Sequence, residues 1–399
     1  MATKELLAIV QAREAARQQG QPAAMVTIYQ TAGSTYRRAG ARMLVLPAPA
    51  GLLGSISGGC LEDDARERAR EVLSAGRSAS VVYDTTAEAD ILFGSGVGCQ
   101  GIVRVLIQPL PSALVDAPAD PLTHVARALH ERRTGVLASV CTVEDPATET
   151  LLGAFLWLED QASEAAGTLL ALDSRLSATV RADAQTVLAT GRPALRSYPV
   201  AAGGRVEIFL DAVQPPRSLL VCGAGEDAAP LAHLAKDLGW RVRVVDGRRA
   251  YALPTRFPDV DELIVCPPRE FAARGHRIEA GESVVLMTHN FSHDKEFLRA
   301  ALASPARYIG VLGPRRRTAR LLSEMADLPG VPLGARSLRR VHGPAGLDIG
   351  AEAPEQIALA IVAEIQAVAS RRRGGLLKRR RSPLHEPISG TRVGQSVTM

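Results

Sequence analysis

The spacing of apolar and polar residues changes near position 218. From Ser218 onward, short uninterrupted apolar runs alternate with segments of helical periodicity, a pattern typical of a parallel sheet covered on both faces. The runs read SLLVC, RVRVV, ELIVC, SVVLM and RYIGVL, and a long apolar helix is predicted over 354–370. We therefore predict a Rossmann-like, doubly wound parallel-sheet domain over 218–370.

The first part of the chain shows shorter and more mixed patterns. Helical periodicity over 4–19 and after Cys60 predicts two helices, and Gly76 is placed to end the second. Together they indicate an α+β domain over 1–213, and an α/β class for the whole chain, divided at the proline-rich residues 214–217. Strands are predicted over 24–30, 41–46, 79–84, 90–93, 102–108, 136–143, 152–158, 194–199 and 204–210, with further helices over 122–132 and 175–190.

Composition excludes several classes of function. The net charge of +5 comes from the segment 371–399, which carries eight cations against Glu386 alone and is expected to be a disordered basic tail, so the rest of the chain carries −2. Aromatic residues make up 4% of the chain, which argues against nucleic-acid binding. Long uncharged apolar runs and a signal peptide are absent from the sequence, and the five scattered cysteines form no CxxC pair. We expect a cytoplasmic protein without disulfides or membrane spans.

The clearest motif is LLVCGAGEDAAPLAHLAKDLGWRVRVVDGRR. Gly223 and Gly225 form a G-x-G turn between a strand and a helix, and Asp246 ends the next strand, as in dinucleotide-binding folds. Glu226 and Asp227 at the helix start would repel a pyrophosphate. The motif therefore predicts the fold and leaves two alternatives, bound NAD(P) or a Rossmann fold without a nicotinamide cofactor.

Two further stretches follow predicted parallel strands. In MTHNFSHD, His289 and His293 stand four residues apart and could bind a metal from one face of a helix. Alternatively, Ser292 caps the helix and both histidines lie at the surface. In GVLGPRRR, Arg315 begins a basic helix that suits either an anion or a solvated face.

The stretch from Gly33 to Glu62 combines anion-binding and thiol chemistry. It reads GSTYRRAGARMLV and, after a turn, GLLGSISGGCLE. The guanidinium groups of Arg37 and Arg38, the amides of Gly58 and Gly59 and the thiol of Cys60 suit an anionic ligand with sulfur or phosphate. Acidic residues at the following helix start oppose a thiolate there. The later glycine-rich FGSGVGCQG around Cys99 permits close approach to a ligand or forms a bend with a buried thiol.

Six stretches in order resemble the XdhC/CoxI family, the accessory proteins of xanthine dehydrogenase, carbon monoxide dehydrogenase and related molybdenum hydroxylases. They are GSTYRRAGARMLV with GSISGGCLE, FGSGVGCQGIV, LLVCGAG with VVDGR, MTHN, YIGVLGPRRR and PAGLDIGAEAPEQIALAI. The resemblance covers about 30–110 and 218–365. One departure is Glu226, where the family often has histidine.

The resemblance implies a function that is not turnover in the usual sense. It implies a cytoplasmic chaperone that binds the molybdenum cofactor (molybdopterin), supports its sulfuration with a cysteine desulfurase and inserts it into a hydroxylase apoenzyme. By position, Cys60 and Cys99 match family cysteines, with Cys60 as metal ligand. Arg37 and Arg38 match an arginine pair. The resemblance also implies a homodimer. At the Rossmann edge, the matching or suitably placed residues are Gly223, Gly225, Asp246, His289 and Arg315.

Two other functions remain open from the sequence. One is an NAD(P)-dependent oxidoreductase, for which His289 and His293 are the candidate proton donors. The other is a regulatory module with an occupied nucleotide site.

Overall fold

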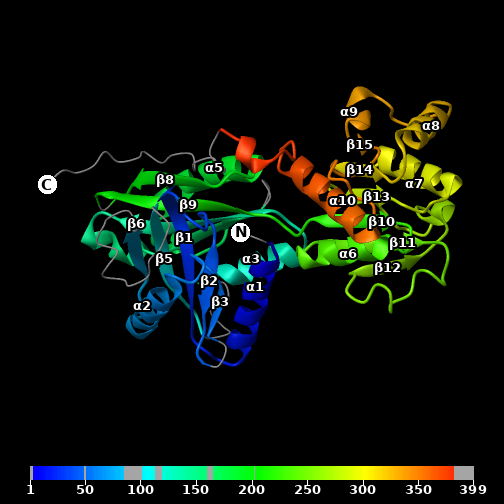
Figure 1. Cartoon of the computed structure of the whole chain (residues 1–399). Helices are drawn as coiled ribbons and strands as arrows, with labels where there is room; N and C mark the ends of the chain where they lie inside the picture. Colours follow the sequence, from blue (N-terminus) through cyan, green and yellow to red (C-terminus); the bar gives the residue numbers. More distant parts are fainter. Residues whose placement is uncertain are drawn as a thin grey trace. The chain divides into compact units, whose positions relative to one another are not determined.

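The computed structural model describes residues 3–48, 51–84, 101–112, 119–159, 165–201 and 203–381. The chain divides into two compact units at Pro215 and Pro216, and each is described by itself. Figure 1 shows both units, with labels on many of their helices and strands.

The first unit contains two antiparallel sheets. The five-stranded sheet has the order β3-β2-β1-β5-β4 and the four-stranded sheet the order β7-β6-β9-β8. The strands are β1 (Ala23–Gly33), β2 (Arg42–Val45), β3 (Leu52–Gly54), β4 (Ala79–Asp84), β5 (Gly101–Leu110), β6 (Gly135–Val143), β7 (Phe155–Leu158), β8 (Ala194–Pro199) and β9 (Arg205–Val213). The helices are α1 (Thr3–Gln18), α2 (Glu62–Ala75), α3 (Pro121–His130), α4 (Leu169–Leu172) and α5 (Ser174–Thr190), with a 3₁₀ turn η3 (Pro146–Leu151).

The two sheets of the first unit share a core. Side chains of β1 alternate between the two faces of its sheet, as the pleat requires. Met25 packs in a cluster with α1, α3 and the four-stranded sheet, whereas Val26 packs in the cluster that α2 covers. The first seven residues of β1 are therefore buried on both faces of the sheet, which explains why apolar residues predominate there. Helix α5 covers the four-stranded sheet through Leu176, Val180 and neighbouring residues.

The second unit contains one six-stranded parallel sheet with the order β12-β11-β10-β13-β14-β15. The order reverses between β10 and β13, which is the point where open α/β sheets bind ligands. The strands are β10 (Ser218–Cys222), β11 (Arg241–Asp246), β12 (Glu262–Val265), β13 (Ser283–Leu286), β14 (Tyr308–Val311) and β15 (Val341–His342). The helices are α6 (Ala228–Asp237), α7 (Phe291–Ala303), α8 (Arg315–Ala326), α9 (Ala335–Leu338) and α10 (Pro354–Ala369), with 3₁₀ turns η4 (Pro268–Glu270) and η5 (Leu377–Arg379).

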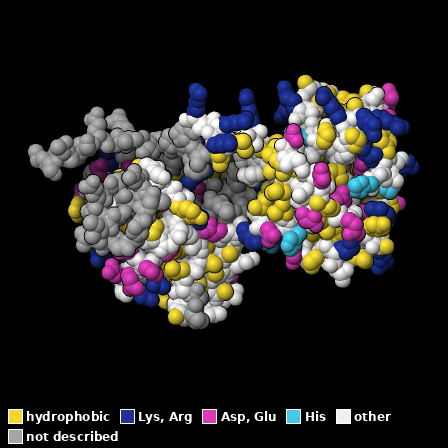
Figure 2. Space-filling model, in the orientation of Figure 1, with side chains coloured by type: hydrophobic (Ala, Val, Ile, Leu, Met, Phe, Trp, Pro, Cys, Tyr) yellow, Lys and Arg dark blue, Asp and Glu magenta, His cyan; other side chains and the backbone are white. Residues whose placement is uncertain are grey.

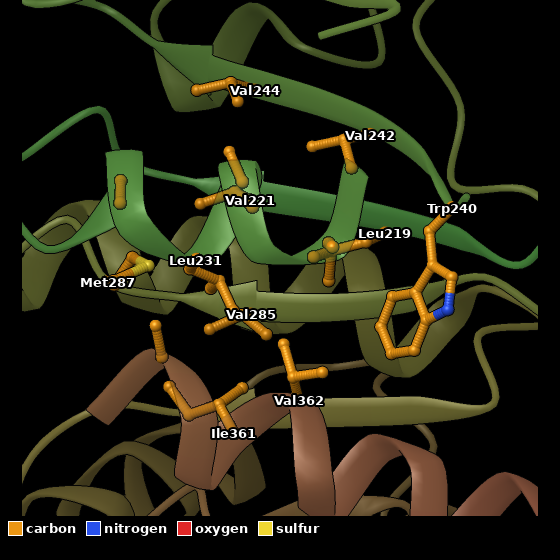
Figure 3. Packing of buried hydrophobic residues seen from close by; sticks show 14 of the residues in the cluster. Leu219, Val221, Leu231, Trp240, Val242, Val244, Val285, Met287, Ile361 and Val362 are labelled. Atoms are coloured by element: carbon orange, nitrogen blue, oxygen red, sulfur yellow. The ribbon is translucent and has the colours of Figure 1, made fainter. Parts of the chain in front are cut away.

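The core of the second unit lies on both faces of this sheet. Figure 3 shows Val285 and Leu231 next to Ile361 and Val362 of α10, and Val221 belongs to the same cluster. A second cluster packs α7 and α8 against the other face through residues such as Phe297, Leu298 and Leu321. Helices on both faces are what the uninterrupted apolar runs required.

The predicted α/β class and the Rossmann-like parallel sheet are confirmed. The sheets of the first unit are antiparallel. Two short strands were not predicted: β3 of the first unit has three residues and β15 of the second unit has two, which is too few to show a period. Predicted strand 152–158 begins only at Phe155, because Leu152 ends the η3 turn. The strand predicted over 90–93 lies outside the described residues. Within the described part of the chain, no helix is long and apolar enough to cross a membrane.

Candidate functional site

The loop between β3 and α2 is folded around the carboxylate of Glu62. The amides of Ser57, Gly58 and Gly59 donate hydrogen bonds to it at 2.9, 3.3 and 2.9 Å. Ser55 donates its hydroxyl at 2.7 Å, and the Ser57 hydroxyl donates as well. Partial burial by itself would raise the pKa of Glu62, but these hydrogen bonds lower it to about 2. Successive amides thus form an anion-binding nest that the chain fills with its own side chain.

Cys60 is presented at the surface by this loop. Its side chain is exposed, and its amide donates to the Ser57 hydroxyl at 3.1 Å. The helix begins at Glu62, so Cys60 precedes it and is not at its first turn. Gly58 has φ +148°, and a Cβ there would lie 3.2 Å from the Tyr36 ring. The exposed ring of Tyr36 and the thiol of Cys60 therefore belong to one surface loop cluster.

The predicted arginine pair is only partly available for a ligand. Arg37 forms an ion pair with Glu5 of α1, with 2.5 Å between Nη2 and Oε2. Glu5 also accepts from the amide of Ser55 at 3.0 Å, so it ties the arginine turn to the thiol loop. Arg38 is exposed on the same turn. The structure thus brings Arg37, Gly58, Gly59 and Cys60 together, but it gives Arg37 and the two glycine amides acidic partners within the chain.

In the second unit, the two glycines of the fingerprint make room for other parts of the protein. A Cβ on Gly223, which has φ +117°, would lie 2.5 Å from the carbonyl oxygen of Met287. A Cβ on Gly225 would lie 2.9 Å from Oδ1 of Asp227. The glycines are therefore needed where the loop after β10 meets the turn after β13.

Both carboxylate oxygens of Asp246 accept hydrogen bonds from within the chain. Its Oδ2 accepts from the Ala224 amide at 2.8 Å and from Nη2 of Arg248 at 2.7 Å, and its Oδ1 accepts from Nε of Arg248 at 3.0 Å. Burial opposes ionisation, but the hydrogen bonds from Arg248 and Ala224 outweigh it and lower the pKa of Asp246. Arg248 in turn stacks on Tyr251, with 4.0 Å from Cζ to the ring centroid. This carboxylate therefore joins the glycine loop to β11.

His289 lies at the carboxyl end of β13, in the turn before α7. Its backbone is left-handed, with φ +57°, a conformation that non-glycine residues rarely adopt. Its Nε2 lies 2.8 Å from Oδ2 of Asp227, in the loop after β10. The turn is held by Thr288, whose hydroxyl donates to the buried Asp294 at 2.7 Å. Asp294 also forms a 2.7 Å ion pair with Arg317 of α8.

The helix after this turn is capped differently from the sequence prediction. Asn290, and not Ser292, accepts from the His293 amide at 3.1 Å. Because His289 precedes the helix in a left-handed conformation, the two histidines do not share a helix face. Within the residues that the structure describes, no group of three His, Cys, Asp or Glu side chains is arranged to hold a metal ion.

Of the remaining predicted residues, Arg315 lies on the surface of α8 and Cys99 lies outside the described residues. Arg315 is the first residue of α8 and is exposed. Figure 2 shows Lys and Arg side chains gathered on the part of the second unit that α8 and α9 form. The exposed arginines there are Arg315, Arg316, Arg320, Arg336 and Arg339.

Sequence reasoning missed Glu5 and Tyr36. It considered Asp227 only as a charge that repels a pyrophosphate, and Glu62 only as one of the acidic residues that oppose a thiolate at Cys60. The signal for Glu62 was available, because an acid directly after a serine–glycine loop can fill a nest of amides. Glu5 and Asp227 gave no such signal, since their partners stand 50 and 62 residues away along the chain.

Comparisons with known proteins agree with this architecture. The family model described as the XdhC Rossmann domain matches residues 219–365, and that of the XdhC and CoxI family matches 16–84. A Bacillus subtilis (strain 168) protein, named as a probable component of xanthine dehydrogenase, is 30% identical over 343 residues, covering 86% of this chain and 92% of its own.

Two further relatives span most of the chain. The molybdenum cofactor insertion chaperone PaoD of Escherichia coli (strain K12) is 22% identical over 349 residues, 88% of this chain and 84% of its own. A crystal structure described as a xanthine dehydrogenase from Bacillus halodurans has 28% identity and a TM-score of 0.69, covering 92% of this chain and 98% of that one. The motifs, the fold and these matches agree, and the chain belongs to the XdhC and CoxI family.

Proposed function

We propose that this protein binds the molybdenum cofactor and inserts it into an apo molybdenum hydroxylase of the xanthine dehydrogenase type. Family membership carries the proposal, since one relative is named a molybdenum cofactor insertion chaperone and another a probable component of xanthine dehydrogenase. The protein acts as an accessory factor that holds and protects the cofactor. The hydroxylation chemistry belongs to the cofactor once it is in the client enzyme.

The loop cluster around Cys60 fits the metal end of this cofactor. An exposed thiol is a soft ligand, suited to molybdenum or to a transferable sulfur. The adjacent ring of Tyr36 is 73% exposed and offers a flat apolar face for a pterin. The amides of Gly58 and Gly59 do not fit the phosphate end, because the Glu62 carboxylate already accepts from them.

Arginines are the better donors for the terminal phosphate. Arg38 of the first unit and Arg315 of the second unit are both exposed, and each is a separate candidate. A guanidinium group suits a phosphate because it offers two parallel donors and a permanent charge. Support for sulfuration by a cysteine desulfurase and assembly as a homodimer belong to the same proposal, the first because an exposed thiol can exchange sulfur.

An NAD(P)-dependent oxidoreductase has less support. In dinucleotide-binding domains, the acid at the end of the second strand receives the ribose hydroxyls. Here both oxygens of Asp246 already accept from Arg248 and Ala224. Binding NAD(P) in the usual way would require Arg248 to leave this carboxylate.

The proposal is tested by purifying the full chain from molybdenum-replete cells and measuring oxidised-pterin fluorescence and bound molybdenum. We expect pterin and molybdenum in the wild type. We expect about a tenfold or greater loss of both in Cys60→Ala and Cys60→Ser, because these changes remove the thiol proposed to bind the metal. Ser74→Ala, at an exposed position of the neighbouring helix, is the control and should retain the cofactor. Stoichiometric NADP(H) without pterin or molybdenum would refute the proposal, and unchanged retention in both Cys60 variants would make Cys60 structural.

A further inference from the structure

The pair formed by Asp227 and His289 stands where the sheet order reverses, between the ends of β10 and β13. Their side chains come from two loops 62 residues apart in sequence, and Nε2 of His289 lies 2.8 Å from Oδ2 of Asp227. His289 is 63% exposed at its side chain, whereas Asp227 is 13% exposed. An accessible imidazole is thus held by a largely buried carboxylate at the ligand-binding edge of the fold.

Helix capping does not explain the carboxylate. Asp227 occupies the N-cap position of α6, where an aspartate normally accepts from an amide of the first helical turn. Here the side chain makes no capping hydrogen bond. Its Oδ1 is buried without a hydrogen-bond partner among the described residues, and Oδ2 faces His289. The Asp227 side chain therefore contacts the imidazole of His289 and does not cap α6.

The backbone around the pair is arranged to keep the imidazole in place. His289 is held in its left-handed conformation by Thr288, whose amide and hydroxyl both bond the buried Asp294. Strained backbone conformations persist only where the surroundings determine them, and they concentrate at functional sites. Gly225 completes the arrangement, because a Cβ there would lie 2.9 Å from Oδ1 of Asp227 and would displace this carboxylate.

The hydrogen bond also decides which imidazole nitrogen is free. A carboxylate can only accept, so the hydrogen of this contact lies on Nε2. In the neutral imidazole Nδ1 then carries the lone pair, and Nδ1 has no hydrogen-bond partner among the described residues. Hydrolases also orient a histidine base with a carboxylate, although there the carboxylate holds Nδ1 and Nε2 is the base.

We propose that His289, positioned by Asp227, is a proton-transfer residue of the Rossmann unit that acts on a ligand carrying a weakly acidic hydroxyl or thiol. The ligand's X–H bond breaks, its proton goes to Nδ1 and the electron pair stays on the ligand atom. The resulting imidazolium keeps its Nε2–H on Asp227, whose charge balances it, and return of the proton restores the starting state. This inference goes beyond the proposed cofactor binding and does not depend on which ligand is bound.

The test measures the nucleophilicity of each histidine on the full chain with diethylpyrocarbonate, without any cofactor. In this reaction an unprotonated ring nitrogen attacks the reagent's carbonyl carbon and monoethyl carbonate leaves. Residue-resolved mass spectrometry gives the rate at His289 and at His233, a surface histidine of similar exposure, 69%, whose nearest carboxylate oxygen is 3.7 Å away. At about pH 8.5, above the ordinary titration range of histidine, we expect His289 to react faster than His233, and Asp227→Asn to slow His289 about tenfold while His233 is unchanged. Asp237→Asn, beside His233, is the matched control and should leave His289 unaffected.

Equal rates at the two histidines, or no effect of Asp227→Asn on a folded protein, would overturn the proposal. If Asp227→Asn does not fold, a measurement on the wild-type protein still tests the proposal. Long-range nitrogen–proton NMR correlations report the tautomer of His289, and we expect the hydrogen on Nε2. A hydrogen on Nδ1 would leave no free base and would refute the assignment. Because neither measurement uses the cofactor, failure of the proposed chaperone function would leave this result intact.

Discussion

At the scale of single residues, the Glu62 carboxylate organises the loop that presents Cys60. We predict that Glu62→Gln destabilises this loop by about 1–3 kcal/mol, because an amide group replaces one acceptor oxygen by a donor facing backbone amides. Hydrogen exchange of the amides of residues 55–61 should accelerate correspondingly. Glu67→Gln, on the exposed face of the same helix, is the control and should change little, since its ion pair with Arg70 is solvated.

The effect of Glu62→Gln should depend on pH. The pKa of Glu62 is about 2 in the folded protein against 4.5 for the free group, so its contribution is complete above about pH 4.5 and is lost as the pH falls toward 2. The difference in exchange between wild type and Glu62→Gln should therefore be large at pH 7 and smaller at pH 3.5. A difference that stays constant over this range would show that charge does not hold the loop.

Single residues also mark the limit of what the sequence could predict here. The spacing of Gly223, Gly225 and Asp246 is local to one strand–helix–strand unit, so their placement in a Rossmann loop was predictable. The contacts of the side chains were not predicted: Asp246 is bonded by Arg248, only two residues further along, and by the distant Ala224 amide, whereas the partner of Asp227 depends entirely on where two distant loops meet. Asp246 faces Arg248 and Ala224 and not a free crevice, and Asp227 faces a histidine from another loop.

At the scale of elements, the contact between the loop after β10 and the turn after β13 is closest at Gly223. We predict that Gly223→Ala destabilises the second unit by roughly 2–4 kcal/mol, because a Cβ would lie 2.5 Å from the Met287 carbonyl oxygen and φ is +117°. Thermal unfolding followed through Trp240 measures this change. Gly275→Ala is the matched control: its φ is also positive, at +84°, but a Cβ there meets nothing within 4 Å, so the cost should be nearer 1 kcal/mol. Equal losses would mean that backbone strain alone matters.

The elements themselves were largely predictable, and their arrangement was not. Uninterrupted apolar runs identified the five longer strands of the parallel sheet, because both faces of that sheet are covered. The two-residue β15 gave no pattern, since two residues cannot show a period. In the first unit, the sequence did not predict that β1 pairs with β5. Because β1 is buried on both faces, its sequence lacks the alternation of apolar and polar residues that would restrict its pairing.

At the scale of the whole molecule, the division at Pro215 and Pro216 suggests two independently stable domains. All six strands of the second sheet pair with one another, and both apolar clusters on its faces contain only residues of that unit. The buried ion pair of Arg243 with Glu282 also lies within it, at 2.6 Å. The Rossmann unit therefore contains everything that its core requires.

We predict that a fragment of residues 216–384 folds by itself. It retains one of the two tryptophans of the chain, Trp240, which is 5% exposed. The fluorescence of Trp240 in the fragment should be that of a buried indole. The fragment should also show one cooperative thermal transition and well-dispersed amide NMR signals. A shorter fragment beginning at Leu231 is the control, because it lacks β10, the strand that pairs with both β11 and β13. That fragment should not fold. Poorly dispersed signals from 216–384 would show that the second unit needs the first, and that the chain behaves as a single folding unit.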